Sequence, residues 1–159
     1  ERLGRAEDGG YYNFRKIDIS AWTPPLDELA AEAKERGIPT LGIGDGGNEV
    51  GMGNFHEELK RLLPAYASCL CTVRTDYALA VDVSNWGAYA LTAALSFMWG
   101  NWRGPEAGEE LAMLKAVKER GAVDGISRLP ELTVDGFDIA TQDKIISSLN
   151  ELWELYRFA

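Results

Sequence analysis

Residues 41–54 read LGIGDGGNEVGMGN and place one Asp and one Glu among six glycines. A short apolar run at 39–43 leads directly into this stretch, and leucines with helical spacing follow at 54–63. This order predicts a strand, then a polar loop, then a helix. Glycines let such a loop bend sharply and bring its backbone close to a ligand. Three interpretations of the loop 44–54 are open: a dinucleotide site, a metal site, or turns alone.

The order of strand, loop and helix recurs further along the chain. Residues 77–83 are β-rich and lead into a polar loop at 82–86, after which apolar residues keep helical spacing to Gly100. Further elements are predicted as helices at 24–36 with Thr23 as N-cap, at 105–120 and at 139–156, and as an extended segment at 68–74. We therefore expect an α/β fold, a layered α/β/α domain with a mainly parallel sheet. The loops 44–54 and 82–86 should open at the same edge of that sheet.

The composition is that of an ordinary globular domain with an acidic surface. The 159 residues fit a single domain, 1–159, and 46% of them are hydrophobic. The formal charge is −9 and the basic residues are scattered, so we expect no nucleic-acid partner. No apolar run has the length of a membrane span. We therefore expect no membrane partner, and a small molecule as the substrate.

The cysteines and the first residues carry expectations about location and completeness. Cys69 and Cys71 stand two positions apart, which predicts two buried free thiols rather than a disulfide. Free thiols are compatible with a cytoplasmic location, which we expect. The chain starts with Glu1, and residues 1–5 have the character of a loop that follows a strand. We therefore expect the domain to lack an N-terminal portion, and the partner to be an N-terminal fragment of the same protein or a second copy in a homo-oligomer.

A dinucleotide site is the weakest of the three interpretations. Gly42, Gly44 and Gly47 spell G-x-G-x-x-G after a predicted strand. That fingerprint also needs a helix that opens at the glycines and a carboxylate about twenty residues further on. Here the predicted helix starts only at residue 54, and residues 62–72 contain no carboxylate.

A metal site is indicated by the oxygen-bearing side chains of Asp45, Asn48 and Glu49, to which Asp82 and Asn85 of the second loop could add. Such groups suit Mn²⁺ or Mg²⁺. Zinc is disfavoured, because the chain has one His and no cysteine pair with zinc spacing. The candidate ligands of a divalent metal, Mn or Mg, are Asp45, Asn48, Glu49 and Asp82.

Turn chemistry is the third interpretation. Asp45 and Asn48 are typical turn residues, whose side chains bond nearby backbone N–H groups. Turns alone explain neither the carboxylate of Glu49 nor the second polar loop at the same edge, and this favours a functional site. Outside the loops we expect Asn54 to cap a helix, Trp86 and Tyr89 to be core aromatics or substrate walls, and His56, Glu57, Glu58, Glu109 and Glu110 to face solvent.

Four segments together resemble the D-glutamate cyclase family: GIGDGGNEVGMGN (42–54), VSNWGAYAL (83–91), GAVDG (121–125) and ERLGRAEDGGYYNFRKIDIS (1–20). The resemblance implies a hydro-lyase that closes D-glutamate to 5-oxo-D-proline with loss of water. It also implies that an N-terminal portion of the family domain is absent here. The matching positions are Asp45, Asn48 and Glu49 in the first loop and Ser84, Asn85 and Trp86 in the second.

Ring closure requires a neutral α-amine and a leaving group whose charge is stabilised. A carboxylate base, Asp45 or Glu49, would take the amine proton, and Asn48 is the third catalytic candidate. A metal ion or the loop N–H groups would polarise the γ-carboxylate, and arginines would clamp the α-carboxylate. The expected substrate contacts are Gly46, Gly47, Ser84, Asn85, Trp86, Arg5 and Arg15.

Two other classes of function stay open. The first is a manganese-dependent phosphohydrolase acting on small phosphate esters, because some relatives of the fold resemble such enzymes. The second is a catalytically incomplete fragment or a binding module.

Overall fold

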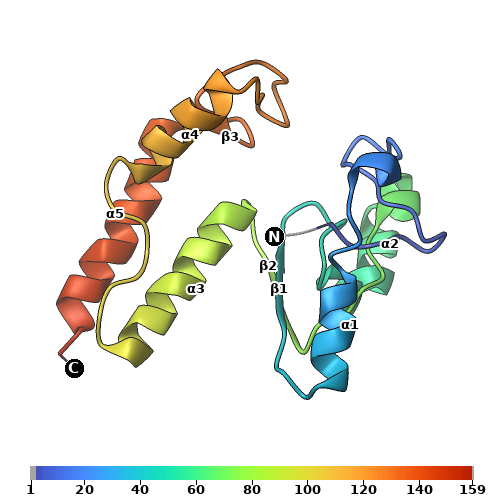
Figure 1. The fold of residues 1–159 in the computed structure, drawn as a ribbon, viewed down its shortest axis with the longest axis horizontal. Coiled ribbons are helices and arrows are strands. Elements are labelled where there is room, and N and C mark those ends of the chain that lie inside the picture. The colour runs from blue at the N-terminus through green and yellow to red at the C-terminus, as the bar shows by residue number, and fades with distance from the viewer. Residues whose placement is uncertain (1–2, 159) are drawn as a thin grey trace. The chain divides into compact units, whose positions relative to one another are not determined.

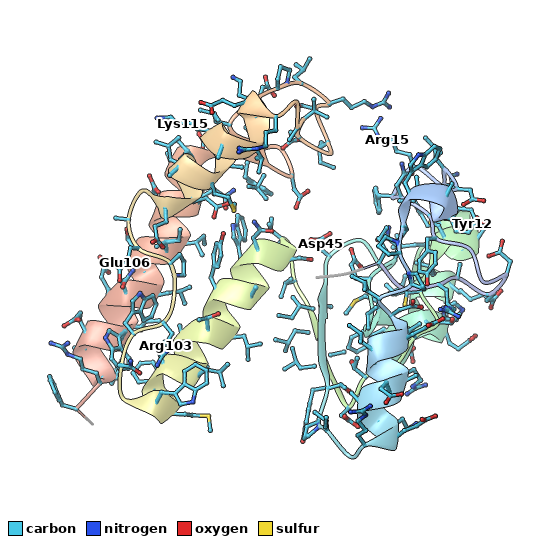
Figure 2. All side chains as sticks on the ribbon, viewed as in Figure 1. Tyr12, Arg15, Asp45, Arg103, Glu106 and Lys115 are labelled. Carbon is cyan, nitrogen blue, oxygen red and sulfur yellow. The ribbon has the colours of Figure 1, made fainter. Side chains whose placement is uncertain are left out.

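The computed structural model describes residues 3–158, and the chain divides into two compact units, Glu1–Gly87 and Ala88–Ala159 (Figure 1; side chains in Figure 2). They are called the first and the second unit below. The single domain expected over 1–159 stays a prediction.

The first unit is built around a two-stranded parallel sheet (Figure 1). Strand β1 (Leu41–Gly44) pairs with β2 (Tyr77–Ala80), with Leu41 opposite Tyr77 and Gly44 opposite Ala80. The helices of this unit are α1 (Glu28–Glu35), α2 (His56–Leu62), the start of α3 (Ser84–Trp99), and 3-10 turns at Ser20–Trp22, Met52–Phe55 and Pro64–Cys69. Mixed α/β structure with parallel pairing is thus confirmed, and the layered α/β/α arrangement stays a prediction.

Close backbone packing explains several of the glycines between β1 and α2. A Cβ atom on Gly42 would lie 2.3 Å from the carbonyl oxygen of Val50, and one on Gly53 would lie 2.5 Å from that of Thr72. Neither neighbour can yield, since both are backbone atoms. The glycine-rich loop therefore folds back onto its own strand, which only glycine allows at these positions.

The expectation of β structure at 68–74 is wrong, because no strand forms there. Residues Pro64–Cys69 form a 3-10 turn, and the buried segment that follows bonds to the glycine loop instead of to a strand. The Cys71 N–H donates to the Gly47 carbonyl at 2.8 Å. Since this segment finds its backbone partners in a loop, its β-rich composition does not give a strand.

Two expected helix starts are also displaced. Helix α1 begins at Glu28 rather than near Thr23, whose hydroxyl donates to the Ile19 carbonyl at 3.0 Å. Helix α2 begins at His56, and Asn54 does not cap it. The Asn54 amide instead bonds both the N–H and the carbonyl of Thr75. A local bond has taken the Thr23 hydroxyl, and a contact distant in sequence has taken the Asn54 amide.

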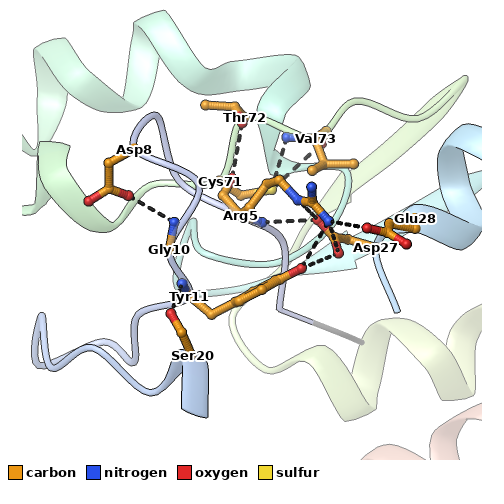
Figure 3. A network of polar contacts seen from close by, with 10 residues as sticks. All are labelled: Arg5, Asp8, Gly10, Tyr11, Ser20, Asp27, Glu28, Cys71, Thr72 and Val73. Carbon is orange, nitrogen blue, oxygen red and sulfur yellow. Dashed lines mark hydrogen bonds and ion pairs between the residues drawn. The ribbon is translucent and has the colours of Figure 1, made fainter. Parts of the chain in front are cut away.

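A buried ion pair holds the N-terminal segment to α1 (Figure 3). Asp27 precedes the helix and accepts hydrogen bonds from Arg5 Nε at 2.8 Å and from the Tyr11 hydroxyl. Arg5 also pairs with Glu28 at 3.0 Å, and its carbonyl accepts the N–H and hydroxyl of Thr72. Burial acts to raise the pKa of Asp27, but the bonds from Arg5 and Tyr11 outweigh it and lower that pKa.

The second unit contains the remainder of α3, α4 (Glu109–Glu119), α5 (Ile139–Tyr156) and a short antiparallel pair, β3 (Thr133–Val134) with β4 (Phe137–Asp138). Helices α4 and α5 pack together (Figure 1), and both lie where the sequence predicts helices. Trp153 is buried, and the centroid of its ring lies 5.1 Å from that of Phe97 and 6.3 Å from that of Trp102. Trp153 is a core residue of this unit together with Ala93, Leu114 and Ile146, whereas Phe97 is 41% exposed.

Asp124, within the GAVDG segment, organises the loop before β3. One carboxylate oxygen accepts the N–H groups of Ile126 and Ser127, and the other accepts the Thr133 hydroxyl and the Gly136 N–H. A single buried carboxylate thus closes the loop 124–136. Across residues 3–158, no helix combines the length and the apolar character needed to cross a membrane.

We expect Asp27→Asn to lower the free energy of unfolding by about 2–3 kcal/mol, because it removes the buried one of the two carboxylates that pair with Arg5 and weakens the bonds from Arg5 and Tyr11. Since the folded-state pKa of Asp27 is lowered, its contribution is complete above the unfolded value of about 3.9 and is lost as the pH falls below it. Urea unfolding at pH 7 and at pH 3 measures this. The difference in unfolding free energy between wild type and Asp27→Asn should be smaller at pH 3 than at pH 7. The control Glu35→Gln, at an exposed site, should match wild type at both pH values. An equal difference at both pH values would contradict the stabilising role of the Asp27 charge.

Candidate functional site

The two polar loops meet through Asp45 and Ser84. Asp45 follows β1, Ser84 begins α3 after β2, and Asp45 Oδ2 accepts the Ser84 N–H at 2.7 Å and the Ser84 hydroxyl at 2.6 Å. The Val81 N–H also donates to the Gly44 carbonyl at 3.0 Å. The expectation that both loops open at one edge of a parallel sheet is therefore confirmed.

Asp45 combines a fixed position with exposure to solvent. Both of its bonds to Ser84 use Oδ2, so Oδ1 can still meet a ligand. Because the Ser84 N–H stands at the start of α3, Asp45 also satisfies one of the N–H groups that a helix leaves unpaired. The Asp45 carboxylate thus has a structural role at the start of α3 and remains exposed to solvent.

Glu49 turns back onto its own loop. Its side chain is only 2% exposed; Oε1 accepts the Gly46 N–H at 2.9 Å and Oε2 accepts the Gly47 N–H at 2.8 Å. Burial raises the pKa of Glu49 and the nearby charge of Asp45 adds to this, while the two glycine N–H groups oppose it. The N–H groups that were expected to polarise a substrate carboxylate are therefore occupied by a carboxylate of the loop itself.

Asn48 ties the glycine loop to the N-terminal segment. Its amide Nδ2 donates to the Tyr12 carbonyl at 2.7 Å, and its own carbonyl accepts the Gly4 N–H at 2.9 Å. Tyr12 opens a hairpin, residues 12–18, that is paired by a bridge between Tyr12 and Asp18. Figure 2 labels Tyr12 and Arg15 on this hairpin, and Asp45. The hairpin thus lies against the glycine loop.

The other expected contact residues are placed less uniformly. Arg5 is held by Asp27 and Glu28, which with Tyr11 raise its pKa. Arg15 is exposed on the hairpin 12–18, and Asp82 is exposed just before α3. Asn85 and Trp86 are half-buried in the first turn of α3, next to Ser84.

The fit of a divalent metal depends on which carboxylates can turn toward it. Both oxygens of Glu49 are bonded to backbone N–H groups, and the Asp45 oxygen Oδ2 is bonded to Ser84. Within residues 3–158, no cluster of three or more His, Cys, Asp or Glu side chains is arranged to hold a metal ion. The candidate donors thus do not form a ready metal site in this geometry, and no reaction step is assigned to a metal below.

Two residues expected in solvent are buried instead. His56 is 9% exposed, because the start of α2 packs on the segment that follows the 3-10 turn Pro64–Cys69. Its Nδ1 lies 2.9 Å from the Cys71 carbonyl oxygen, and its Nε2 lies 3.1 Å from Glu7 Oε1. Glu110 is 3% exposed and bonds the Tyr89 hydroxyl, so Tyr89 is one side of a buried polar pair. Both expectations were wrong, whereas those for Glu57, Glu58 and Glu109 are confirmed.

Cys69 and Cys71 are buried free thiols, as expected. Burial raises the pKa of the Cys71 thiol to about 11, and its Sγ lies 3.2 Å from the Val73 N–H. A thiol in such surroundings is a packing group and not a nucleophile.

The hairpin 12–18 and its contact with the glycine loop were missed by sequence reasoning, which named Arg15 and the segment 1–20. Its turn is made by Asn13, whose side chain bonds the N–H groups of Arg15 and Ile17. An Asn that starts a short polar turn was the available signal.

Comparison with known proteins agrees with the segments around these loops. The family model described as D-glutamate cyclase-like, C-terminal, matches residues 1–150. The human protein D-glutamate cyclase, mitochondrial, is 46% identical to this chain over 100 residues, which are 62% of this chain and 16% of the human protein. The chain thus corresponds to a small part of the length of that relative. Since the family model covers nearly all of the chain, the protein belongs to the D-glutamate cyclase-like family, in its C-terminal region.

Proposed function

We propose that this chain contributes the active-site loops of a D-glutamate cyclase, a hydro-lyase that closes D-glutamate to 5-oxo-D-proline. The family membership supports the substrate. The observation that carries the proposal within the chain is the junction of Asp45 with Ser84, which joins two loops of the matched region at one edge of a parallel sheet. Ligands of such sheets bind at this edge.

The reaction forms one bond and breaks one. The α-amine nitrogen attacks the γ-carboxyl carbon to form the ring amide, a C–O bond breaks, and the departing oxygen leaves as water with two protons that come from the ammonium group, since the γ-carboxylate carries none. The amine must lose a proton before it attacks. A base is therefore needed near the nitrogen, and a donor is needed near the leaving oxygen.

Asp45 is the better base of the two carboxylates expected for this role. Ser84 holds one oxygen from two directions, and the other oxygen stays on the exposed side of the loop. Glu49 has both oxygens engaged and is buried. We assign proton removal to Asp45, and to Glu49 the maintenance of the loop shape that presents Asp45.

The start of α3 suits the carboxylate that loses oxygen. Ser84, Asn85 and Trp86 form the first turn of a 16-residue helix, whose N-terminal N–H groups favour negative charge. The Ser84 N–H and hydroxyl are bonded to Asp45 and the Trp86 N–H to the Val83 carbonyl, so among the three this supports Asn85 as a substrate contact. Charge that develops on the leaving oxygen would be stabilised by this end of the helix.

The remaining expectations about cofactors and partners follow from the same proposal. A small acidic molecule is the ligand, and bound Mn or Mg stays a prediction that the metal content of the purified chain tests. The human relative is, by its name, a mitochondrial protein; a cytoplasmic location for this chain stays a prediction. The same holds for an N-terminal fragment or a second copy as the protein partner.

We expect Asp45→Asn to lower kcat for cyclisation of D-glutamate by about a hundredfold or more, since it removes the base. An Asn oxygen can still accept both bonds from Ser84, so the fold should persist. Chromatographic detection of 5-oxo-D-proline measures the rate. The control Glu58→Gln, an exposed carboxylate on α2, should keep the wild-type rate; an Asp45→Asn protein with wild-type turnover would refute the role of Asp45.

Glu49→Gln separates structure from catalysis. The amide keeps one acceptor oxygen and turns an NH₂ group toward a glycine N–H, so we expect a loss of about 1–2 kcal/mol in the free energy of unfolding. Loss of the buried charge offsets part of this cost, which keeps the change modest. Thermal and urea unfolding should show the loss in Glu49→Gln and not in Asp45→Asn. Unchanged stability with abolished turnover in Glu49→Gln would instead make Glu49 the base.

A further inference from the structure

The hairpin 12–18 has a tightly built turn. The Asn13 N–H donates to the Ile17 carbonyl at 3.1 Å, and the Lys16 N–H donates to the Asn13 carbonyl at 2.9 Å. The Asn13 side chain accepts the N–H groups of Arg15 at 3.0 Å and of Ile17 at 3.1 Å. Lys16 has a φ of 63°, in the left-handed region where glycine is the ordinary choice. Lys16 therefore occupies a position whose backbone conformation is less strained with glycine.

The same hairpin is fixed against the glycine loop at two points. Asn48 Nδ2 donates to the Tyr12 carbonyl at 2.7 Å. The Phe14 ring lies 3.3 Å from where a Cβ on Gly46 would be, and it stacks on Tyr66 with 4.7 Å between the ring centroids. The hairpin thus forms a wall beside Gly46.

Lys16 places its charge on this wall. Its Nζ lies 5.6 Å from the centroid of the Tyr66 ring, in cation–π contact with the ring on which Phe14 stacks. Tyr66 therefore links the position of the Lys16 ammonium to the ring beside Gly46. The exposed Lys16 side chain is in this way held beside Tyr66, whose ring stacks on Phe14.

Charge balance calls for a cation at this place. The glycine loop carries Asp45 and Glu49, the chain has a formal charge of −9, and the proposed substrate has two carboxylates. Several cations of the first unit are already in ion pairs with carboxylates: Arg5 with Asp27 and Glu28, Arg36 with Glu32, and Lys60 with Glu7. The contact of Lys16 is with an aromatic ring, which leaves the three N–H donors of an ammonium for an anion.

We propose that Lys16 binds a carboxylate of the acidic substrate at the glycine loop. This inference rests on the proposed function for the identity of the substrate, and it replaces Arg5, which Asp27 and Glu28 hold, in the expected carboxylate clamp. Arg15, the other expected arginine, precedes Lys16 on the same turn. The hairpin 12–18 is then the side of the site that selects an anion.

The test uses Lys16→Gly in the full chain. Glycine suits the left-handed backbone, so this variant removes the ammonium without straining the turn and should unfold at or above the wild-type temperature. NMR titration of D-glutamate, followed through the Gly46 and Gly47 amides, gives Kd, and the cyclisation assay gives turnover. We expect Kd to rise roughly tenfold in Lys16→Gly, as for loss of one charged hydrogen bond, and to stay near wild type in Lys16→Arg. The control Lys34→Ala, which removes an exposed lysine of α1, should not change Kd.

The outcomes separate the two proposals. Equal Kd for wild type and Lys16→Gly, or an equal loss in Lys34→Ala, would overturn the role of Lys16. Binding by wild type that weakens in Lys16→Gly, with no cyclisation in either, would support Lys16 as an anion contact and overturn the cyclase proposal. No binding of D-glutamate to the wild-type chain would overturn both.

Discussion

The contact of β1 with its own returning loop is the constraint on which the rest of the first unit depends. Gly42 packs against the carbonyl of Val50 with no room for a side chain. Since the loop must turn back within a few residues, Glu49 is buried and closes on the N–H groups of the two central glycines. Asp45 is left at the rim, where Ser84 fixes it. The shape of the loop is thus set by packing, and of its two carboxylates only Asp45 is exposed.

Local patterns carried much of the fold. Parallel strands at β1 and β2 and the helices α4 and α5 follow from apolar runs and helical spacing, and the meeting of the two polar loops follows because parallel strands end at one edge. The prediction for 68–74 was wrong because the backbone groups of this segment bond to loops instead of to a strand. No local sequence pattern reveals such a partner. The expected cap at Thr23 was wrong because its hydroxyl bonds the Ile19 carbonyl, and the one at Asn54 was wrong because its amide bonds the distant Thr75.

The sequence allowed the polar residues of the candidate site to be predicted, but not which role each of them has. The sequence identifies Asp45 and Glu49 as chemically notable, but only tertiary geometry distinguishes an exposed carboxylate from one that bonds its own loop. Arg5 is another example: its guanidinium serves an ion pair more than twenty positions away. His56 and Glu110 show that a polar residue at a helix end is buried when another segment covers it. Burial of a charged side chain depends on what packs over it, which no local pattern records.

The bonds of the N-terminal segment have a consequence for the order in which the protein takes shape during synthesis. Gly4 and Arg5 bond Asn48 and Thr72, so during synthesis this segment must wait for partners that lie up to 67 positions further along the chain. At translation speeds of roughly 5–20 residues per second this interval is on the order of 3–14 seconds. The nascent first unit is therefore expected to stay open to chaperones and proteases until the segment after Cys71 has emerged.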